Sequence, residues 1–262
     1  MSMALTYGEY LQLDQLLDAQ RPLSAGPEHD EHLFIVIHQV YELWFKQLLH
    51  ESSLLSRSLE SAQTHRALAT FKRILTILKT LVAQVDILET MTPMSFNSFR
   101  ARLDNASGFE SVQFREFEFV LGHKRQSALA HYPEGSQERA RLERALAAPT
   151  LWDAFLRYLV GMGFALPEAA LARDVTRPIE PMPALQDVLL QVYRQDALVS
   201  QVCERLVDLD EGLQEWRYRH VKMVERTIGT KAGSGGSSGA EYLRSTLFRP
   251  AFPDLWAIRV KL

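Results

Sequence analysis

A histidine in the C-terminal third of the sequence, His220, could bind a metal or a cofactor. It lies in the run WRYRHVKMVER at 216–226, which has the pattern of a helix with one apolar face. Residues three, four or seven positions away share that mainly apolar face, namely Leu213, Trp216, Met223, Val224 and Thr227. Taken alone, this pattern favours a core histidine. The glycine-rich run GSGGSSG at 233–239 could fold tightly over a bound molecule, and the two features together suggest a cofactor site.

A second histidine, His38, lies four residues after Phe34. In a helix this spacing stacks the imidazole and the aromatic ring on one face. One interpretation is a pocket wall that contacts a ligand. The simpler interpretation is a core histidine whose imidazole hydrogen-bonds Glu42, one turn further along the helix.

Arg100 is a charged residue in an apolar setting, because Phe96, Phe99 and Leu103 lie three or four positions from it. A guanidinium group on such a face must find an anion, since an unpaired buried charge is very unfavourable. That anion is either a protein carboxylate such as Asp104 or the carboxylate of a ligand.

Other charged residues admit two interpretations. A basic run surrounds His220 and comprises Arg217, Arg219, Lys222 and Arg226. Such a run is usually a solvated helix face, but it would also suit a cofactor with acidic groups, such as a haem with its propionates. Arg115 and Arg125 are interpreted as surface or structural residues.

Three apolar side chains cluster near the N-terminus, on a short helix: Tyr7, Tyr10 and Leu11. A helix this short could dock onto its own bundle or onto a neighbouring subunit. The cluster therefore predicts a docking patch.

Several site types are excluded by missing signatures. The glycine run lacks the Gly-Lys-Ser/Thr ending and the preceding strand of a phosphate-binding loop. The remaining histidines show no metal-ligand spacing, and no nucleophile motif is present. The single cysteine, Cys203, excludes an internal disulfide and a cysteine-based metal cage within one chain.

Composition narrows the class of protein further. The 262 residues carry a net charge of −3. The sequence therefore has neither the basic surface of a nucleic-acid-binding protein nor a polybasic membrane anchor. No apolar run is long enough to span a membrane. The first residues lack the basic start and apolar core of a signal peptide, so the expected compartment is the reducing cytoplasm.

The helical period dominates the sequence, and convincing alternation of period two is absent. The main expected helices span about 28–57, 65–91, 96–103, 107–124 and 186–228. Capping boxes mark helix starts at Thr6–Glu9, Ser107–Glu110, Thr150–Asp153 and Ser238–Glu241. We therefore predict an all-α fold, a large helical bundle that forms a single domain over 1–262, with 125–183 as a small helical excursion within it.

The sequence resembles tryptophan 2,3-dioxygenase, an all-helical haem enzyme, over essentially its whole length. The matching segments are LTYGEYL at 5–11, HQVYELWFKQ at 38–47, Phe99–Arg100, SGFES at 107–111, Trp216–Arg217 through His220, ERTIG at 225–229, the glycine run, and Tyr242–Leu243. Agreement of this density does not arise by chance.

The resemblance implies a cofactor, haem b, with His220 as the axial ligand of the iron. It implies a substrate pocket in which Phe34 and His38 lie on the distal side and Phe96 walls the indole. Arg100 would pair with the carboxylate of L-tryptophan, and His38 would hydrogen-bond the indole N–H, either as a base or only as a positioning partner.

The resemblance also implies a homotetramer. Tyr7, Tyr10 and Leu11 would reach the pocket of a neighbouring subunit, and Ser234 would contact the ammonium and carboxylate groups of the substrate. The activity implied is opening of the indole ring of L-tryptophan with O2 to give N-formyl-L-kynurenine, the first step of tryptophan catabolism by the kynurenine route.

Two positions depart from the family pattern. Ser234 stands where the glycine run of the family usually has threonine, so we expect altered affinity or stereoselectivity. Glu110 stands where the family often has glutamine, and both residues can complete a capping box.

Two other functions remain alternatives: a haem monooxygenase on the same scaffold that acts on a tryptophan-like or other aromatic substrate, and a non-catalytic helical protein.

Overall fold

The computed structural model describes residues 4–26, 28–103, 110–231 and 239–262, and every regular element in these ranges is helical, which confirms the predicted all-α fold. The elements are α1 Tyr7–Leu11, α2 Leu13–Leu17, α3 His29–Glu60, α4 Thr64–Leu88, α5 Pro93–Arg100, α6 Val112–Leu121, the 3-10 helix η2 Gln126–His131, α7 Gln137–Ala147, α8 Leu151–Gly161, α9 Glu168–Leu171, α10 Pro183–Gln195, α11 Ala197–Ile228, α12 Ala240–Arg244, α13 Pro253–Ala257 and the 3-10 helix η3 Ile258–Lys261.

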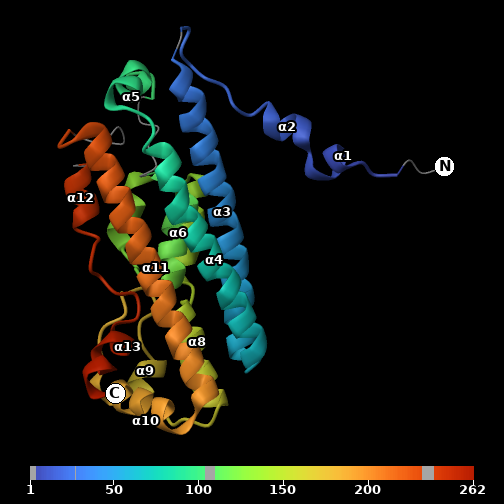
Figure 1. Cartoon of the computed structure of the whole chain (residues 1–262). Coiled ribbons are helices and arrows are strands. Elements are labelled where there is room, and N and C mark those ends of the chain that lie inside the picture. The colour runs from blue at the N-terminus through green and yellow to red at the C-terminus, as the bar shows by residue number, and fades with distance from the viewer. Residues whose placement is uncertain (1–3, 27, 104–109, 232–238) are drawn as a thin grey trace.

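Three long helices, α3, α4 and α11, form the centre of the bundle (Figure 1). Helix α4 packs against both α3 and α11, while α6 and α8 pack against α3. Side chains such as Leu55, Phe71 and Leu206 are fully buried between these helices. Burial of each such side chain contributes roughly 1.5–3 kcal/mol, so the centre of the bundle is a firm support for side chains that project from α3 and α11.

One predicted helix is two helices in the structure. The helical pattern at 186–228 is interrupted at Asp196, where α10 ends and α11 begins. The Asp196 backbone is extended, and its carboxylate accepts hydrogen bonds from the backbone N–H groups of Leu198 and Val199, both at 2.9 Å. This N-cap starts a new helix within an apolar pattern that continues through it.

Two other helices begin at positions that differ from the expected starts. Helix α6 begins at Val112, and its N-cap is Ser111, whose hydroxyl accepts from the Phe114 N–H. The predicted capping box began at Ser107, which lies outside the described residues. Helix α5 begins at Pro93, because proline suits the first turn of a helix, where its missing N–H is not needed.

The segment predicted as a helical excursion packs in two ways. Side chains of α6, η2 and α7 form a small cluster of their own, which includes Phe119, Leu129 and Leu142. The side chain of Lys124 supports it by donating to three carbonyl groups at the C-terminal end of α7. In contrast, α8 belongs to the main core through Trp152 and neighbouring side chains.

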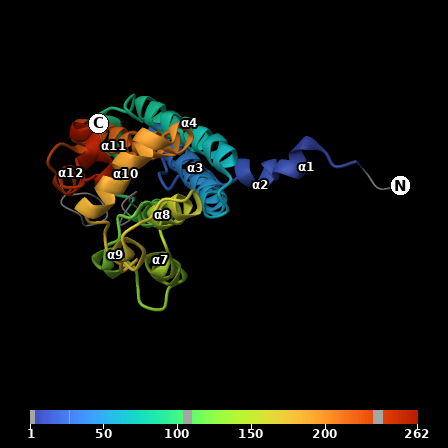
Figure 2. The ribbon, with the colours of Figure 1, turned by 90° about the horizontal axis from the view of Figure 1, so that it is seen from below.

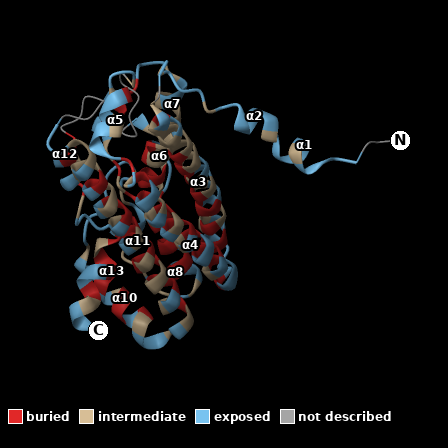
Figure 3. Cartoon of the chain, turned by 45° about the horizontal axis from the view of Figure 1, so that its top comes forward, coloured by how far each residue is buried: buried red, intermediate tan, exposed pale blue. Residues whose placement is uncertain are grey.

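The N-terminal arm, defined here as residues 4–18 with α1 and α2, projects away from the bundle (Figures 1 and 2). The predicted capping box is present, since Thr6 and Glu9 bond reciprocally. Its large apolar side chains are exposed, with Tyr7 at 75% and Tyr10 at 73% (Figure 3). Among the described residues, no helix is long and apolar enough to cross a membrane.

Candidate active site

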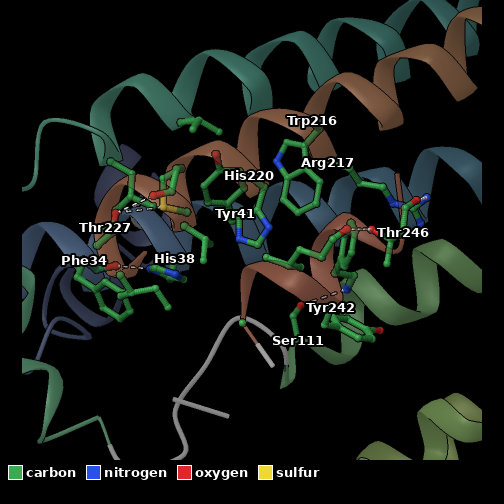
Figure 4. A pocket seen from close by; sticks show the side chains of 18 of the residues that line it. Phe34, His38, Tyr41, Ser111, Trp216, Arg217, His220, Thr227, Tyr242 and Thr246 are labelled. Carbon is green, nitrogen blue, oxygen red and sulfur yellow. Dashed lines mark hydrogen bonds between the residues drawn. The ribbon is translucent and has the colours of Figure 1, made fainter. Parts of the chain in front are cut away.

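A large cavity opens at the end of the bundle where α5 and α12 lie, and side chains from α3, α4, α5, α6, α11 and α12 line it. Its volume is about 1590 Å³ when the open mouth is included. Figure 4 shows it from close by, with His38 on α3 and His220 on α11.

The His220 side chain lines the cavity from α11 and stacks almost parallel on the Trp216 ring, with centroids 5.1 Å apart and planes 9° apart. Burial, and then the nearby His38, lower the pKa of His220 to about 4. Its imidazole is therefore neutral at pH 7, the state in which histidine binds metals. No described residue hydrogen-bonds its ring nitrogens, so a nitrogen lone pair can serve a bound group.

His38 faces the same cavity from α3, one helical turn after Phe34. Its Nδ1 lies 2.7 Å from the Phe34 carbonyl oxygen. Because a carbonyl oxygen only accepts, Nδ1 must carry the proton, and burial lowers the pKa of His38 so that the ring is neutral. Its Nε2 is then an acceptor. The alternative partner proposed from sequence, Glu42, instead accepts a hydrogen bond from Gln113.

An aromatic wall stands beside His38. The Phe34 ring lies 4.0 Å from the His38 ring and 5.9 Å from that of Phe96, centroid to centroid. Fully buried Phe99 supports this wall from behind, and Arg100, the last residue of α5, lines the cavity next to it. The structure thus brings Phe34, His38, Phe96, Arg100 and His220 to one cavity.

A buried ionic cluster on the cavity wall was missed from sequence. The Glu118 carboxylate, 2% exposed, pairs with Arg115, with Arg217 at 2.6 Å and with Arg125 at 2.8 Å. Burial works to raise the pKa of Glu118, but the three arginines outweigh it and hold that pKa at about 2. Three guanidinium groups on one carboxylate make this end of the cavity positive.

Arg115 was interpreted from sequence as a surface or structural residue; it is not on the surface, because it is 6% exposed, and it both pairs with Glu118 and lines the cavity. The run FREFEF at 114–119 held the signal for this cluster. Its aromatic residues are too closely spaced for one face of a helix, so some of the charged residues between them must be buried as well. Arg115 and Glu118 are three positions apart, the spacing at which helical side chains meet.

The other predicted site residues lie elsewhere. Tyr7, Tyr10 and Leu11 are exposed on the N-terminal arm and do not line the cavity. Ser234, with most of the glycine run, lies outside the described residues. In the basic run, Arg219 and Arg226 pair with Glu89, and Lys222 pairs with Glu225, so these three form a solvated face.

The donor set fits a cofactor that brings its own metal ligands. Among the described residues, no group of three or more histidine, cysteine or acidic side chains could hold a bare metal ion. One neutral imidazole facing a wide, mainly apolar cavity with a positive end matches a haem, whose ring supplies the other iron ligands and whose acidic groups need a basic partner.

The fold and the cavity together define a helical protein in which two imidazoles and an aromatic wall line one cavity. Comparison with known proteins makes this specific: the family described as Tryptophan 2,3-dioxygenase matches residues 1–150 and 175–262. The chain belongs to the tryptophan 2,3-dioxygenase family.

Individual relatives agree with the family match. A protein named Tryptophan 2,3-dioxygenase from Herpetosiphon aurantiacus is 61% identical over 262 residues, all of both chains. Its namesake from Anaeromyxobacter sp. is 61% identical over 259 residues, 98% of this chain and 96% of the relative. One from Caulobacter vibrioides is 44% identical over the full length of both chains. The similarity therefore includes residues 151–174, which the family match leaves out.

Proposed function

We propose that this protein uses O2 to open the indole ring of L-tryptophan, giving N-formyl-L-kynurenine. The observation that supports this most directly is the pair of neutral imidazoles, His38 and His220, that face one aromatic-lined cavity. One imidazole is available to bind iron, and the other is available to contact the indole.

The cofactor proposed is haem b, with His220 as the axial ligand of its iron. The positive end of the cavity, formed by Arg115 and Arg217, would hold the acidic groups of the porphyrin. A histidine-ligated haem iron supplies the chemistry with O2, and the protein supplies binding and orientation.

Substrate orientation is assigned to side chains on α3 and α5. The Arg100 guanidinium would hold the substrate carboxylate through a charge-assisted contact, and Phe34 and Phe96 would pack on the indole. The Nε2 atom of His38 would accept the indole N–H, because Nδ1 already donates to the Phe34 carbonyl. These contacts place the indole double bond that is cleaved, and the aromatic wall excludes water from it.

The assembly proposed is a homotetramer. The exposed apolar side chains of the N-terminal arm need a cover, and a second copy of the chain provides it. Tyr7, Tyr10 and Leu11 would then complete the pocket of the neighbouring subunit, and Ser234 would contact the amino acid group of the substrate.

The test is an absorption assay with the reduced, haem-loaded protein and L-tryptophan, following N-formylkynurenine. We expect this chromophore to form, and we expect the product mass to correspond to two added oxygen atoms. A product with one added oxygen would identify a monooxygenase on the same scaffold. A purified protein that stays colourless when haem is supplied would identify a non-catalytic helical protein.

Replacing Arg100 by alanine should weaken binding of L-tryptophan by about 2–5 kcal/mol, because the substrate carboxylate loses a charged partner. The measurement is the dissociation constant of L-tryptophan, together with that of tryptamine, which lacks the carboxylate. Tryptamine should bind the wild type and the variant alike. Equal weakening of both ligands would show that Arg100 acts on the pocket as a whole, not on the carboxylate.

Replacing His38 by alanine should remove the acceptor for the indole N–H, at a cost of roughly 1–3 kcal/mol in kcat/KM for L-tryptophan. The diagnostic substrate is 1-methyl-L-tryptophan, which has no N–H to donate. We expect the wild type to prefer L-tryptophan over the methylated substrate, and we expect His38→Ala to reduce that preference. An unchanged preference would remove His38 from this contact.

A further inference from the structure

The base of the N-terminal arm is tied to the bundle by a buried carboxylate. Glu31 lies in the first turn of α3 and is only 2% exposed. Its Oε1 accepts from the Leu23 N–H at 2.7 Å, and its Oε2 accepts from the Ser24 N–H at 3.0 Å. Both oxygens of one charged group therefore hold successive backbone amides of the stalk, defined here as residues 19–26.

A second tie holds the other end of the stalk. The side-chain amide of Gln39 donates to the Ala19 carbonyl at 3.0 Å, and its oxygen accepts from Gln20 at 2.6 Å. Glu31 and Gln39 are eight residues apart on α3, so they lie near one face of that helix. The stalk is thus attached at two points along α3.

The stalk needs these ties because it has no regular structure of its own. Residues 19–26 form no helix, and each residue left unconstrained keeps backbone freedom that ordering must remove. Beyond the stalk, the arm extends from the bundle with its apolar side chains exposed (Figures 2 and 3). Its direction is therefore set where the stalk meets α3.

The Glu31 side chain stays ionised where the stalk meets α3. Burial favours the neutral acid, but hydrogen bonds from Ser24 and Leu23 and the positive charge of Arg102 outweigh it, so the pKa of Glu31 lies below its ordinary value. Arg102 follows α5 by two residues, which places this point close to the segment that carries Arg100.

We propose that Glu31 is a positioning residue for assembly: it directs the arm away from its own bundle, so that Tyr7, Tyr10 and Leu11 reach a second copy of this chain. This inference rests on the proposed docking of the arm into a neighbouring subunit. Glu31 does not line the cavity, so it would act on the reaction only by presenting the arm.

The experiment compares haem-loaded wild type with Glu31→Gln, which keeps the shape of the side chain but removes its charge and one of its two acceptors. Asp30→Asn is the matched control, because Asp30 is the neighbouring carboxylate and makes no hydrogen bond to stalk residues 19–26. Amide hydrogen exchange of Leu23 and Ser24, native mass spectrometry and the specific activity on dilution are measured for each protein.

For Glu31→Gln we expect amide exchange at Leu23 and Ser24 to accelerate on the order of tenfold or more, because one of the two hydrogen bonds is lost and the other is no longer strengthened by a charge. The assembly should dissociate at a correspondingly higher protein concentration, and activity per subunit should fall on dilution. Asp30→Asn should match the wild type in all three measurements.

Glu31→Gln that keeps both the amide protection and the assembly of the wild type overturns the inference. If circular dichroism shows that this variant has lost helix, Gln39→Ala decides instead: weakened assembly with intact helix content supports the inference, and unchanged assembly overturns it. A wild type that is monomeric at every concentration overturns the inference and the proposed assembly together, whereas the product assay reports separately on the oxygenase function.

Discussion

The His220→Gly protein is expected to bind haem without the spectrum of a histidine-ligated iron and to lose oxygenase activity. The physical reason is that His220 is the neutral imidazole on the cavity wall with no hydrogen bond from any described residue, so it is the proposed iron ligand. Even residues that only support a ligand cost about 10–100-fold in metal affinity when removed, and loss of the ligand itself should exceed that.

Absorption spectra of the reduced protein, with and without added imidazole, test this prediction. Free imidazole should enter the space left by the side chain and restore the histidine-type spectrum. His38→Ala is the control, because it removes the other imidazole of the cavity and should leave the axial ligand in place. A normal spectrum in His220→Gly without added imidazole would show that another residue binds the iron.

The Glu118→Gln protein is expected to be strongly destabilised. Its carboxylate is buried and neutralises three arginines, two of which, Arg115 and Arg217, are themselves buried. Removing one partner of a buried ion pair costs about 3–5 kcal/mol, because it leaves charges buried without compensation. The melting temperature should fall by roughly 6–20 °C, given about 2–4 °C per kcal/mol for a chain of this size.

Calorimetry measures the melting temperatures of Glu118→Gln and of a control variant, Glu116→Gln, in which another glutamate of the same helix is changed in the same way. Glu116 lies on the same helix and pairs with Arg141, but that pair is partly exposed, with the two side chains 23% and 40% accessible. Its loss should cost no more than about 1 kcal/mol. Equal destabilisation by the two substitutions would contradict the role assigned to the buried cluster.

The same carboxylate predicts a pH dependence of stability. The pKa of Glu118 is about 2 in the folded protein, compared with an ordinary value of 4.5. A depressed pKa contributes stability that is fully present above the ordinary value and is lost as the pH falls towards the folded value. The free energy of unfolding of the wild type should therefore decrease between pH 4.5 and pH 2 more steeply than that of Glu118→Gln.

Much of the fold could be predicted from local pattern. The long helices α3 and α4 were expected to within three residues at each end, because their apolar stripes end where the packing ends. The division between α10 and α11 was not predicted, because the apolar pattern continues through Asp196 and only its cap marks the break. The short C-terminal helix α13 was also missed, since five residues carry too little periodicity to be recognised.

The candidate site could be predicted where an unusual residue stood in an apolar run. His38, Arg100 and His220 met that condition, whereas Phe34 and Phe96 were expected from the family resemblance, and all five line the cavity. The cluster around Glu118 was missed although Arg115 and Glu118 stand among phenylalanines, because arginine and glutamate on a helix are ordinarily solvated. Their burial depends on Arg217, which comes from a helix 99 positions further along the chain.

The sequence by itself determined the helical character of this protein, its family and the residue types that its chemistry requires, because these depend on composition and on spacing along one helix. Only the tertiary structure decided that two imidazoles share one cavity, that Nε2 of His38 is the acceptor, and that the N-terminal arm leaves the bundle at Glu31. These features depend on distances between side chains from different helices, or on which of two possible partners a side chain reaches, and spacing along the chain does not specify either.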